Sequence, residues 1–234
     1  MAITYVAAGV VVGSSSTTNI AVPKPSGVAE NDILICCVAT YAGNQVITTH
    51  ADWTNIHANV ETDPAAADGT GTEVTIARRI LTASEPASWS FTLSVSTNVY
   101  VAAVMAFRGV LLSSPVRTSG TSTAEDVSTL DSPSLTGVQS TDMVVTFGAS
   151  RPFSSDATHH VDGPTGSWTS PAEADTGPSA SEFSFPAAAA GSYQLNGTTG
   201  TFDAITANGL MVTAAAALQE AQSNPNPMGR MWVM

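Results

Sequence analysis

Short runs of β-branched and aromatic residues, separated by Gly, Pro, Asn and Ser, recur along the whole chain. This pattern is typical of β-strands joined by turns, and no long helical period accompanies it. The sequence therefore predicts an all-β protein with no helix longer than a turn or two. The predicted strands are residues 3–12, 17–22, 32–40, 45–48, 54–60, 73–81, 88–94, 99–110, 132–136, 142–149, 181–186, 191–195 and 204–218.

The alanine-rich run at residues 210–219 is ambiguous, because alanine favours helices. It occupies the same place in the second half of the chain as residues 99–110 occupy in the first. That earlier run, rich in Val, Tyr and Phe, has a strong β pattern. We therefore predict a strand for the later run as well.

The order of these features indicates a degenerate internal duplication. In each half an aspartate opens an apolar run, a tryptophan follows a loop, and a long apolar run comes last. Spacings that drift between the halves indicate loop insertions, which surface loops tolerate. The matched pairs are Asp32 and Asp142, Trp53 and Trp168, and Trp89 and Tyr193, separated by 110, 115 and 104 residues.

The halves are predicted at residues 1–116 and 132–222, joined by a polar connection at 117–131 and followed by a C-terminal arm at 223–234. They form either tandem domains or one sandwich. Each half offers about four or five strands and leaves an open apolar face, so mutual burial favours one unit. The predicted fold is a single antiparallel β-sandwich, jelly-roll-like, built from two similar halves.

Charged residues make up only 11% of the chain, and the net charge is −12, with Lys24 the only lysine. Nucleic-acid binding depends on clustered Lys and Arg, so this class of function is not expected. The adjacent arginines, Arg78 and Arg79, are predicted to point to opposite faces of a strand. A surface of Ser, Thr and Ala suits either solvent or contact with neighbouring subunits.

The N-terminal residues are apolar but too short to span a bilayer, and no basic region precedes them. We therefore expect neither a targeting segment nor a membrane span. The two cysteines, Cys36 and Cys37, are adjacent in a predicted strand and point to opposite faces. They are predicted to be free, small hydrophobic residues rather than a disulfide.

No motif with catalytic or metal-ligand spacing is apparent, so no catalytic residue, cofactor or metal ligand is predicted. The histidines at 50, 57, 159 and 160 lack such spacing. The acidic loop with Glu61, Asp63, Asp68 and Glu73 offers calcium ligands but lacks the alternating order of a calcium loop. The matched aromatic residues form either a sugar-stacking platform or core contacts, and their repeated positions favour the core.

Four segments carry a resemblance to a β-sandwich module of tailed-phage head and tail proteins. Residues 22–35, with Val22-Pro-Lys-Pro-Ser-Gly and Asp32-Ile-Leu, resemble its opening. Residues 52–54, 85–91 and 104–110 are similar to its later steps, although the first of these lacks the usual glycine. The resemblance implies a jelly-roll-like sandwich, no catalysis and a place in the virion.

These inferences predict a non-enzymatic virion protein, assembled in the host cytoplasm, that decorates or cements the outside of a capsid. Its expected partners are the major capsid protein or copies of itself. The alternative is a tail-fibre or receptor-binding module that binds a host glycan. The expected partner interface is the arm, through Met228, Arg230, Met231, Trp232 and Val233.

Overall fold

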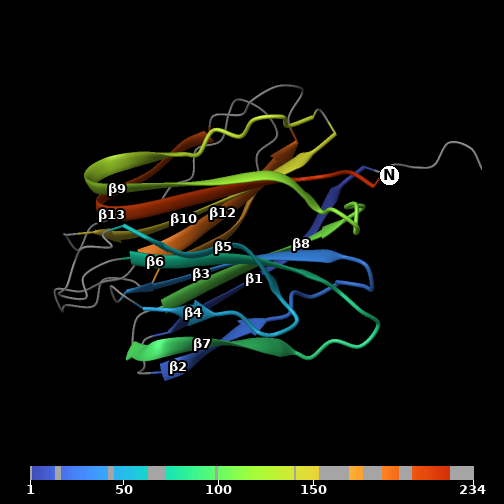
Figure 1. Ribbon diagram of the computed structural model, residues 1–234, viewed down its shortest axis with the longest axis horizontal. Coiled ribbons are helices and arrows are strands. Elements are labelled where there is room, and N and C mark those ends of the chain that lie inside the picture. Colours follow the sequence, from blue (N-terminus) through green and yellow to red (C-terminus); the bar gives the residue numbers. More distant parts are fainter. Residues whose placement is uncertain are drawn as a thin grey trace, which may run out of the picture.

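The computed structural model consists of antiparallel β-strands, and no helix occurs in the residues that it describes (Figure 1). These are residues 2–13, 17–41, 45–62, 72–97, 100–139, 141–152, 169–175, 186–194 and 202–221. The all-β prediction is confirmed. The strands are β1 (Thr4–Gly13), β2 (Thr17–Pro23), β3 (Ile33–Tyr41), β4 (Ile47–Thr48), β5 (Thr54–Glu61), β6 (Thr72–Ile80), β7 (Ser88–Thr97), β8 (Tyr100–Arg108), β9 (Val116–Ser132), β10 (Met143–Pro152), β11 (Thr169–Asp175), β12 (Pro186–Gln194) and β13 (Phe202–Leu218).

The strands form three sheets stacked in three layers (Figure 1). The central sheet has the order β1-β8-β3-β6-β5, and the small sheet, β2-β7-β4, covers one of its faces. The second-half sheet, β11-β12-β10-β13-β9, covers the other face. The predicted sandwich thus has a third layer, because the first half alone supplies two sheets.

The central sheet is buried on both faces, which explains the unbroken apolar runs of its inner strands. On β3 the odd-numbered residues, such as Ile35 and Cys37, pack toward the second-half sheet. The even-numbered ones, such as Leu34 and Cys36, pack toward the small sheet. The two cysteines are therefore free and on opposite faces, as predicted. Burial raises the pKa of Cys37 to about 12, so this thiol is inert.

The two five-stranded sheets have the same strand order. Replacing β1, β3, β5, β6 and β8 by β9, β10, β11, β12 and β13, respectively, gives β9-β13-β10-β12-β11. This is the order of the second-half sheet read from its other edge. Both sets also follow the chain in the same sequence. This match supports our interpretation of an internal duplication. It also places Tyr193 on β12, the counterpart of β6, so it does not correspond to Trp89 on β7.

The turn that leads into the central strand of each sheet is also repeated. Gly27 and Gly137 both adopt positive φ, 74° and 75°, a conformation that favours glycine. Five residues later Asp32 and Asp142 are buried. Each carboxylate accepts a hydrogen bond from the backbone N–H three residues earlier, at 2.8 Å and 2.9 Å. The same turn thus starts β3 and β10.

An arginine binds each buried carboxylate through two hydrogen bonds, but it comes from a different strand in each half. Arg108, at the end of β8, donates to Asp32 at 2.7 Å from both Nε and Nη2. Arg117, near the start of β9, donates to Asp142 at 2.6 Å and 3.2 Å. Two parallel bonds fix the orientation of the pair.

Several strand predictions need correction. The segment expected as a polar connection, residues 117–131, lies within β9, which pairs with β13 over its whole length. Of the strand expected at 132–136, only Ser132 is strand, as the last residue of β9; the rest is the turn before β10, where Pro133 and Gly137 oppose a continuous ladder. No strand was predicted at β11. The ambiguous run 210–219 is strand through Leu218, as predicted.

Candidate functional site

The outer face of the small sheet is distinguished by its lack of charge. Its three strands contain no charged residue at all. Alternation along β7 places Trp89, Phe91 and Leu93 inside and the intervening hydroxyl residues outside. We call the outward residues of this sheet the hydroxyl face. They are Asn19, Ala21, Thr48, Ser88, Ser90, Thr92 and Ser94.

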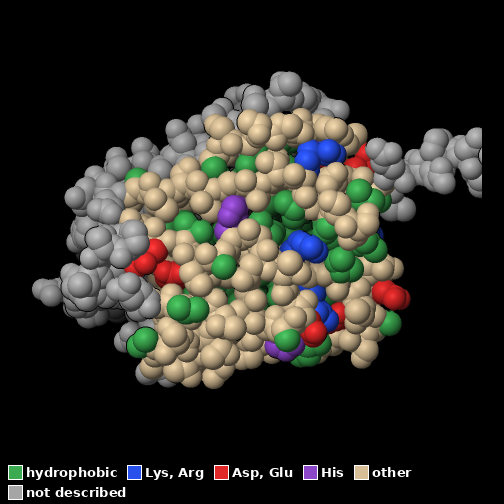
Figure 2. Space-filling view, in the orientation of Figure 1, with side chains coloured by type: hydrophobic (Ala, Val, Ile, Leu, Met, Phe, Trp, Pro, Cys, Tyr) green, Lys and Arg blue, Asp and Glu red, His purple; other side chains and the backbone are tan. Residues whose placement is uncertain are grey.

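Short polar contacts run across the hydroxyl face. Asn19 and Thr92 are directly opposite each other on β2 and β7, and Thr48 on β4 is opposite Thr92 on the other side. The Ser90 hydroxyl donates to Asn19 Oδ1 at 3.1 Å. In Figure 2 the surface over β7 is mostly tan, without Lys, Arg, Asp or Glu side chains. The three strands thus present hydroxyl and amide groups but no charged side chain.

An aromatic cluster supports the hydroxyl face from below. Trp53 and Trp89 meet edge to face with ring centroids 5.4 Å apart, and Trp53 meets Phe91 in the same way at 5.5 Å. Both tryptophans are buried, at 6% and 1% exposure. The core role is therefore confirmed for this pair, and they provide no sugar-stacking platform. Trp168 and the side chain of Tyr193 lie outside the described residues.

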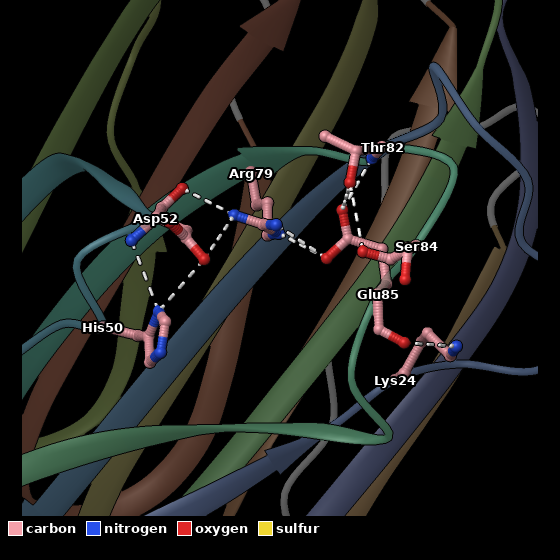
Figure 3. A network of polar contacts seen from close by, with 7 residues as sticks. All are labelled: Lys24, His50, Asp52, Arg79, Thr82, Ser84 and Glu85. Carbon is pink, nitrogen blue, oxygen red and sulfur yellow. Dashed lines mark hydrogen bonds and ion pairs between the residues drawn. The ribbon is translucent and has the colours of Figure 1, made fainter.

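A polar network fixes the loops at one end of the small sheet to the central sheet (Figure 3). At its centre the guanidinium of Arg79, on β6, donates to Glu85 Oε2 from Nη2 at 2.6 Å and from Nε at 3.0 Å. Arg79 also donates to the backbone oxygen of Asp52 at 3.0 Å and lies 5.6 Å from the Trp89 ring. The network thus connects the β6–β7 loop to the start of β5.

The Glu85 carboxylate has its second oxygen occupied as well. Thr82 donates to Oε1 from its backbone N–H at 2.6 Å and from its hydroxyl at 2.9 Å. Burial favours the neutral acid, but these hydrogen bonds and those from Arg79, together with its charge, lower the pKa of Glu85. Lys24, just after β2, donates to the backbone oxygen of Glu85 at 3.3 Å. The ionised Glu85 therefore orients the segments that flank β2 and β7.

The structure also places the two adjacent arginines and two of the histidines that were considered in the sequence. Arg78 and Arg79 point to opposite faces, as predicted, because they pair with Ile35 and Leu34 in the register of β3 and β6. His50 lies beside Asp52, with Nδ1 3.6 Å from Oδ2. Burial lowers the pKa of His57, which favours the neutral imidazole.

Within the described ranges no three His, Cys, Asp or Glu side chains lie close enough together to hold a metal ion. No helix there has the length and hydrophobicity to cross a membrane. His159 and His160 lie outside the described residues, as do Met228, Arg230, Met231, Trp232 and Val233 of the expected arm interface.

Sequence reasoning missed both the hydroxyl face and the Arg79–Glu85 network. The first had a readable signal, since the segment Ser-Trp-Ser-Phe-Thr-Leu-Ser at 88–94 alternates hydroxyl and large apolar residues. The second had none, because its partners meet only when the β6–β7 loop folds back.

Comparison with protein-family models, curated proteins and solved structures gives no match to this chain.

Proposed function

We propose that this protein is a non-enzymatic structural subunit that works by protein–protein contact through the hydroxyl face. One observation supports this most strongly: a whole sheet of the first half lacks charge on its strands. The carboxylates and guanidinium groups beside it are engaged in the Arg79–Glu85 network rather than lying across it. An uncharged hydroxyl surface loses little solvation energy when another protein covers it.

The sheet edges favour the same proposal. Charged side chains are one means by which exposed edge strands avoid pairing with other chains. Here both edge strands, β2 and β4, have none within their bounds, and Val46 beside β4 is 48% exposed. Val95, on β7, is likewise exposed. A neighbouring subunit that covers this edge would shield these apolar side chains from water.

We place the subunit on the outside of a phage capsid, as a decoration or cement protein. The support is the resemblance of residues 22–35 and three later segments to the phage β-sandwich module. The Gly27–Asp32 turn within that resemblance has a counterpart at Gly137–Asp142. Partners of this kind are the major capsid protein or a second copy of the chain. The C-terminal arm stays a second predicted contact.

The alternative, a glycan-binding tail module, receives less support. Sugar recognition by aromatic stacking requires an exposed ring face. Trp53 and Trp89 are buried, and Tyr100 is half-buried beside the same core. None of these three rings has an open face on which a sugar could stack. The alternative therefore depends on Trp168 and Tyr193, the other two aromatic residues considered in the sequence, whose side chains lie outside the described residues.

Cryo-electron microscopy of purified particles that contain the protein tests the proposal. We expect many copies on the capsid exterior, with the residues of the hydroxyl face against a neighbouring subunit. A location at the tail tip, with the hydroxyl face open to solvent, would refute both the place and the contact. Capsid copies that use another face would refute the contact alone.

A further inference from the structure

Two carboxylates face each other at the end of the central sheet where β5 ends and β6 begins. Glu61 and Glu73 are direct partners in the register of these strands. Directly opposed residues have Cβ atoms about 5 Å apart, and like charges in this position are destabilising. Figure 2 shows acidic side chains close together over this end of β5 and β6, beside the grey atoms. The structure must therefore compensate for the repulsion between these two carboxylates.

A third oxygen lies in the same row. Thr40, a buried residue near the end of β3, is opposite Glu73 on its other side. The neighbouring pair, Ala39 and Val74, packs toward the second-half sheet. Thr40 and Glu73 therefore face the small sheet, because alternate residues point to opposite faces. Val60 also contacts the core toward the second-half sheet, which places Glu61 in this row.

Two of these side chains, Glu73 and Thr40, are buried and each has an oxygen without a hydrogen bond in the described part of the chain. Glu73 is 2% exposed and Thr40 is 0% exposed. Neither Glu73 Oε1 nor Thr40 Oγ1 has a hydrogen-bond partner there. Buried polar groups without partners cost free energy, and nearly all in native proteins are satisfied by protein, water or an ion. Burial and the nearby charge of Glu61 also raise the pKa of Glu73.

We propose that Glu61, Glu73 and Thr40 bind one divalent cation of the calcium class. Two carboxylates and a hydroxyl form an all-oxygen ligand set, which suits a hard cation rather than zinc or copper. Calcium tolerates irregular geometry and completes its shell of about 6–8 oxygens with water. The ion would convert the repulsion between β5 and β6 into a bridge. Asp63 and Asp68 lie outside the described residues and contribute nothing to this argument.

The competing account is that Glu73 is simply protonated, which also removes the repulsion. The two accounts predict opposite responses to calcium. A cation site gains occupancy and stability when calcium is added at neutral pH, whereas a protonated carboxyl does not respond to it. The site lies on the central sheet, outside the hydroxyl face, so its failure leaves the proposed contact function untouched.

Thermal unfolding and titration calorimetry of the full chain with CaCl2, against EDTA, test the proposal. We expect one calcium per chain and a melting temperature about 2–4 °C higher in millimolar calcium. Glu73→Gln should abolish both effects, and Glu61→Gln should weaken binding at least tenfold. Glu30→Gln, in an exposed turn, removes the same net charge and should retain the full response. Magnesium, which demands a tighter octahedral shell, should give a smaller shift.

The absence of calcium-dependent heat and of any shift in melting temperature for the wild-type chain would overturn the proposal. So would a Glu73→Gln variant that keeps the full shift. If Glu73→Gln does not fold, Glu61→Gln decides: a full response in that variant assigns the calcium effect to general screening of the acidic chain.

Discussion

At the residue scale, the salt bridges of Asp32, Asp142 and Arg79 hold particular loops in place. Asp32 and Asp142 each fix the turn before a central strand, and Arg79 fixes the loop before β7. Neighbouring residues of a strand point to opposite faces, so the orientations of Arg78 and Arg79 were predictable. The same holds for Cys36 and Cys37. Their partners were not, because Glu85 and Arg117 approach only through tertiary folding. The alternation of residues along a strand therefore predicts the face of the sheet on which a side chain lies, but not the residues that it contacts on that face.

The two Asp–Arg turns should differ in how much each contributes to stability. Asp142→Asn leaves Arg117, whose side chain is 25% exposed, without its carboxylate. We expect a loss of about 2–4 kcal/mol in the free energy of unfolding. Asp32→Asn should cost less, because Arg108 is 47% exposed and can turn to water. Chemical denaturation of the two variants checks this, and an equal or reversed ranking would contradict it.

Glu85 should make the protein acid-sensitive. Its folded pKa lies below the ordinary value of 4.5. The ionised form therefore contributes stability above pH 4.5, and this contribution is lost as the pH falls through the folded pKa. Glu85→Gln should lower the melting temperature at pH 7 and narrow its difference from wild type at pH 3. Glu30→Gln serves as the control. A difference that does not change with pH would show that the charge of Glu85 is unimportant.

At the element scale, the strands with strong apolar patterns were predictable and those with weak patterns were not. β3, β6, β7 and β8 lie close to their predicted bounds. β9 was missed because its residues, such as Thr118, Ser119 and Thr121, have little apolar character. Its pairing with the apolar β13 decides its structure, which shows how tertiary context overrides a weak local preference. β11 was missed for the same reason.

A glycine on the first strand of each five-stranded sheet packs beneath a proline. A Cβ added at Gly9 would lie 3.2 Å from Pro23 Cγ, and one at Gly120 would lie 3.0 Å from Pro133 Cβ. The two contacts involve matched strands, β1 and β9, and the two prolines each precede the repeated turn by four residues. This repeated contact predicts that neither position accepts a larger side chain.

Gly120→Val should therefore destabilise the protein, although valine is a good strand former. We expect a loss of about 1–3 kcal/mol from overpacking against Pro133. Thr123→Val, at an exposed position on the same strand, should change stability by less than about 0.5 kcal/mol. Urea denaturation of both variants provides the measurement. If Gly120→Val is as stable as wild type, the close contact with Pro133 is wrong.

At the scale of the whole molecule, the central sheet unites the two halves. One hydrophobic core joins residues of the first half, including Ile35 and Phe107, with residues of the second, including Phe147 and Leu218. The prediction of one sandwich rested on mutual burial of open faces, and this shared core is the burial it required. The third layer was not predictable, because nothing in the sequence assigned β2, β4 and β7 to a separate sheet.

We predict one cooperative unfolding transition for the chain. In a fragment of residues 1–115, the second-half sheet would no longer cover the apolar face of the central sheet. The fragment should therefore aggregate or fail to fold. Differential scanning calorimetry of the full chain checks the first expectation, and expression of the fragment checks the second. Two well-separated transitions, or a stable monomeric fragment, would mean that the halves are independent domains.

The central claim is that the hydroxyl face is the contact surface, and one pair of variants tests it directly. Thr92→Lys places a charge in the middle of that face, whereas Thr54→Lys places the same charge at an exposed position on β5. Binding of each variant to particles assembled without the protein is then measured by co-sedimentation, with melting temperatures as a check on folding. The account predicts that both melt like wild type, that Thr54→Lys binds normally, and that Thr92→Lys binds at least about tenfold more weakly, a difference of about 1.4 kcal/mol. Normal binding by Thr92→Lys would contradict it.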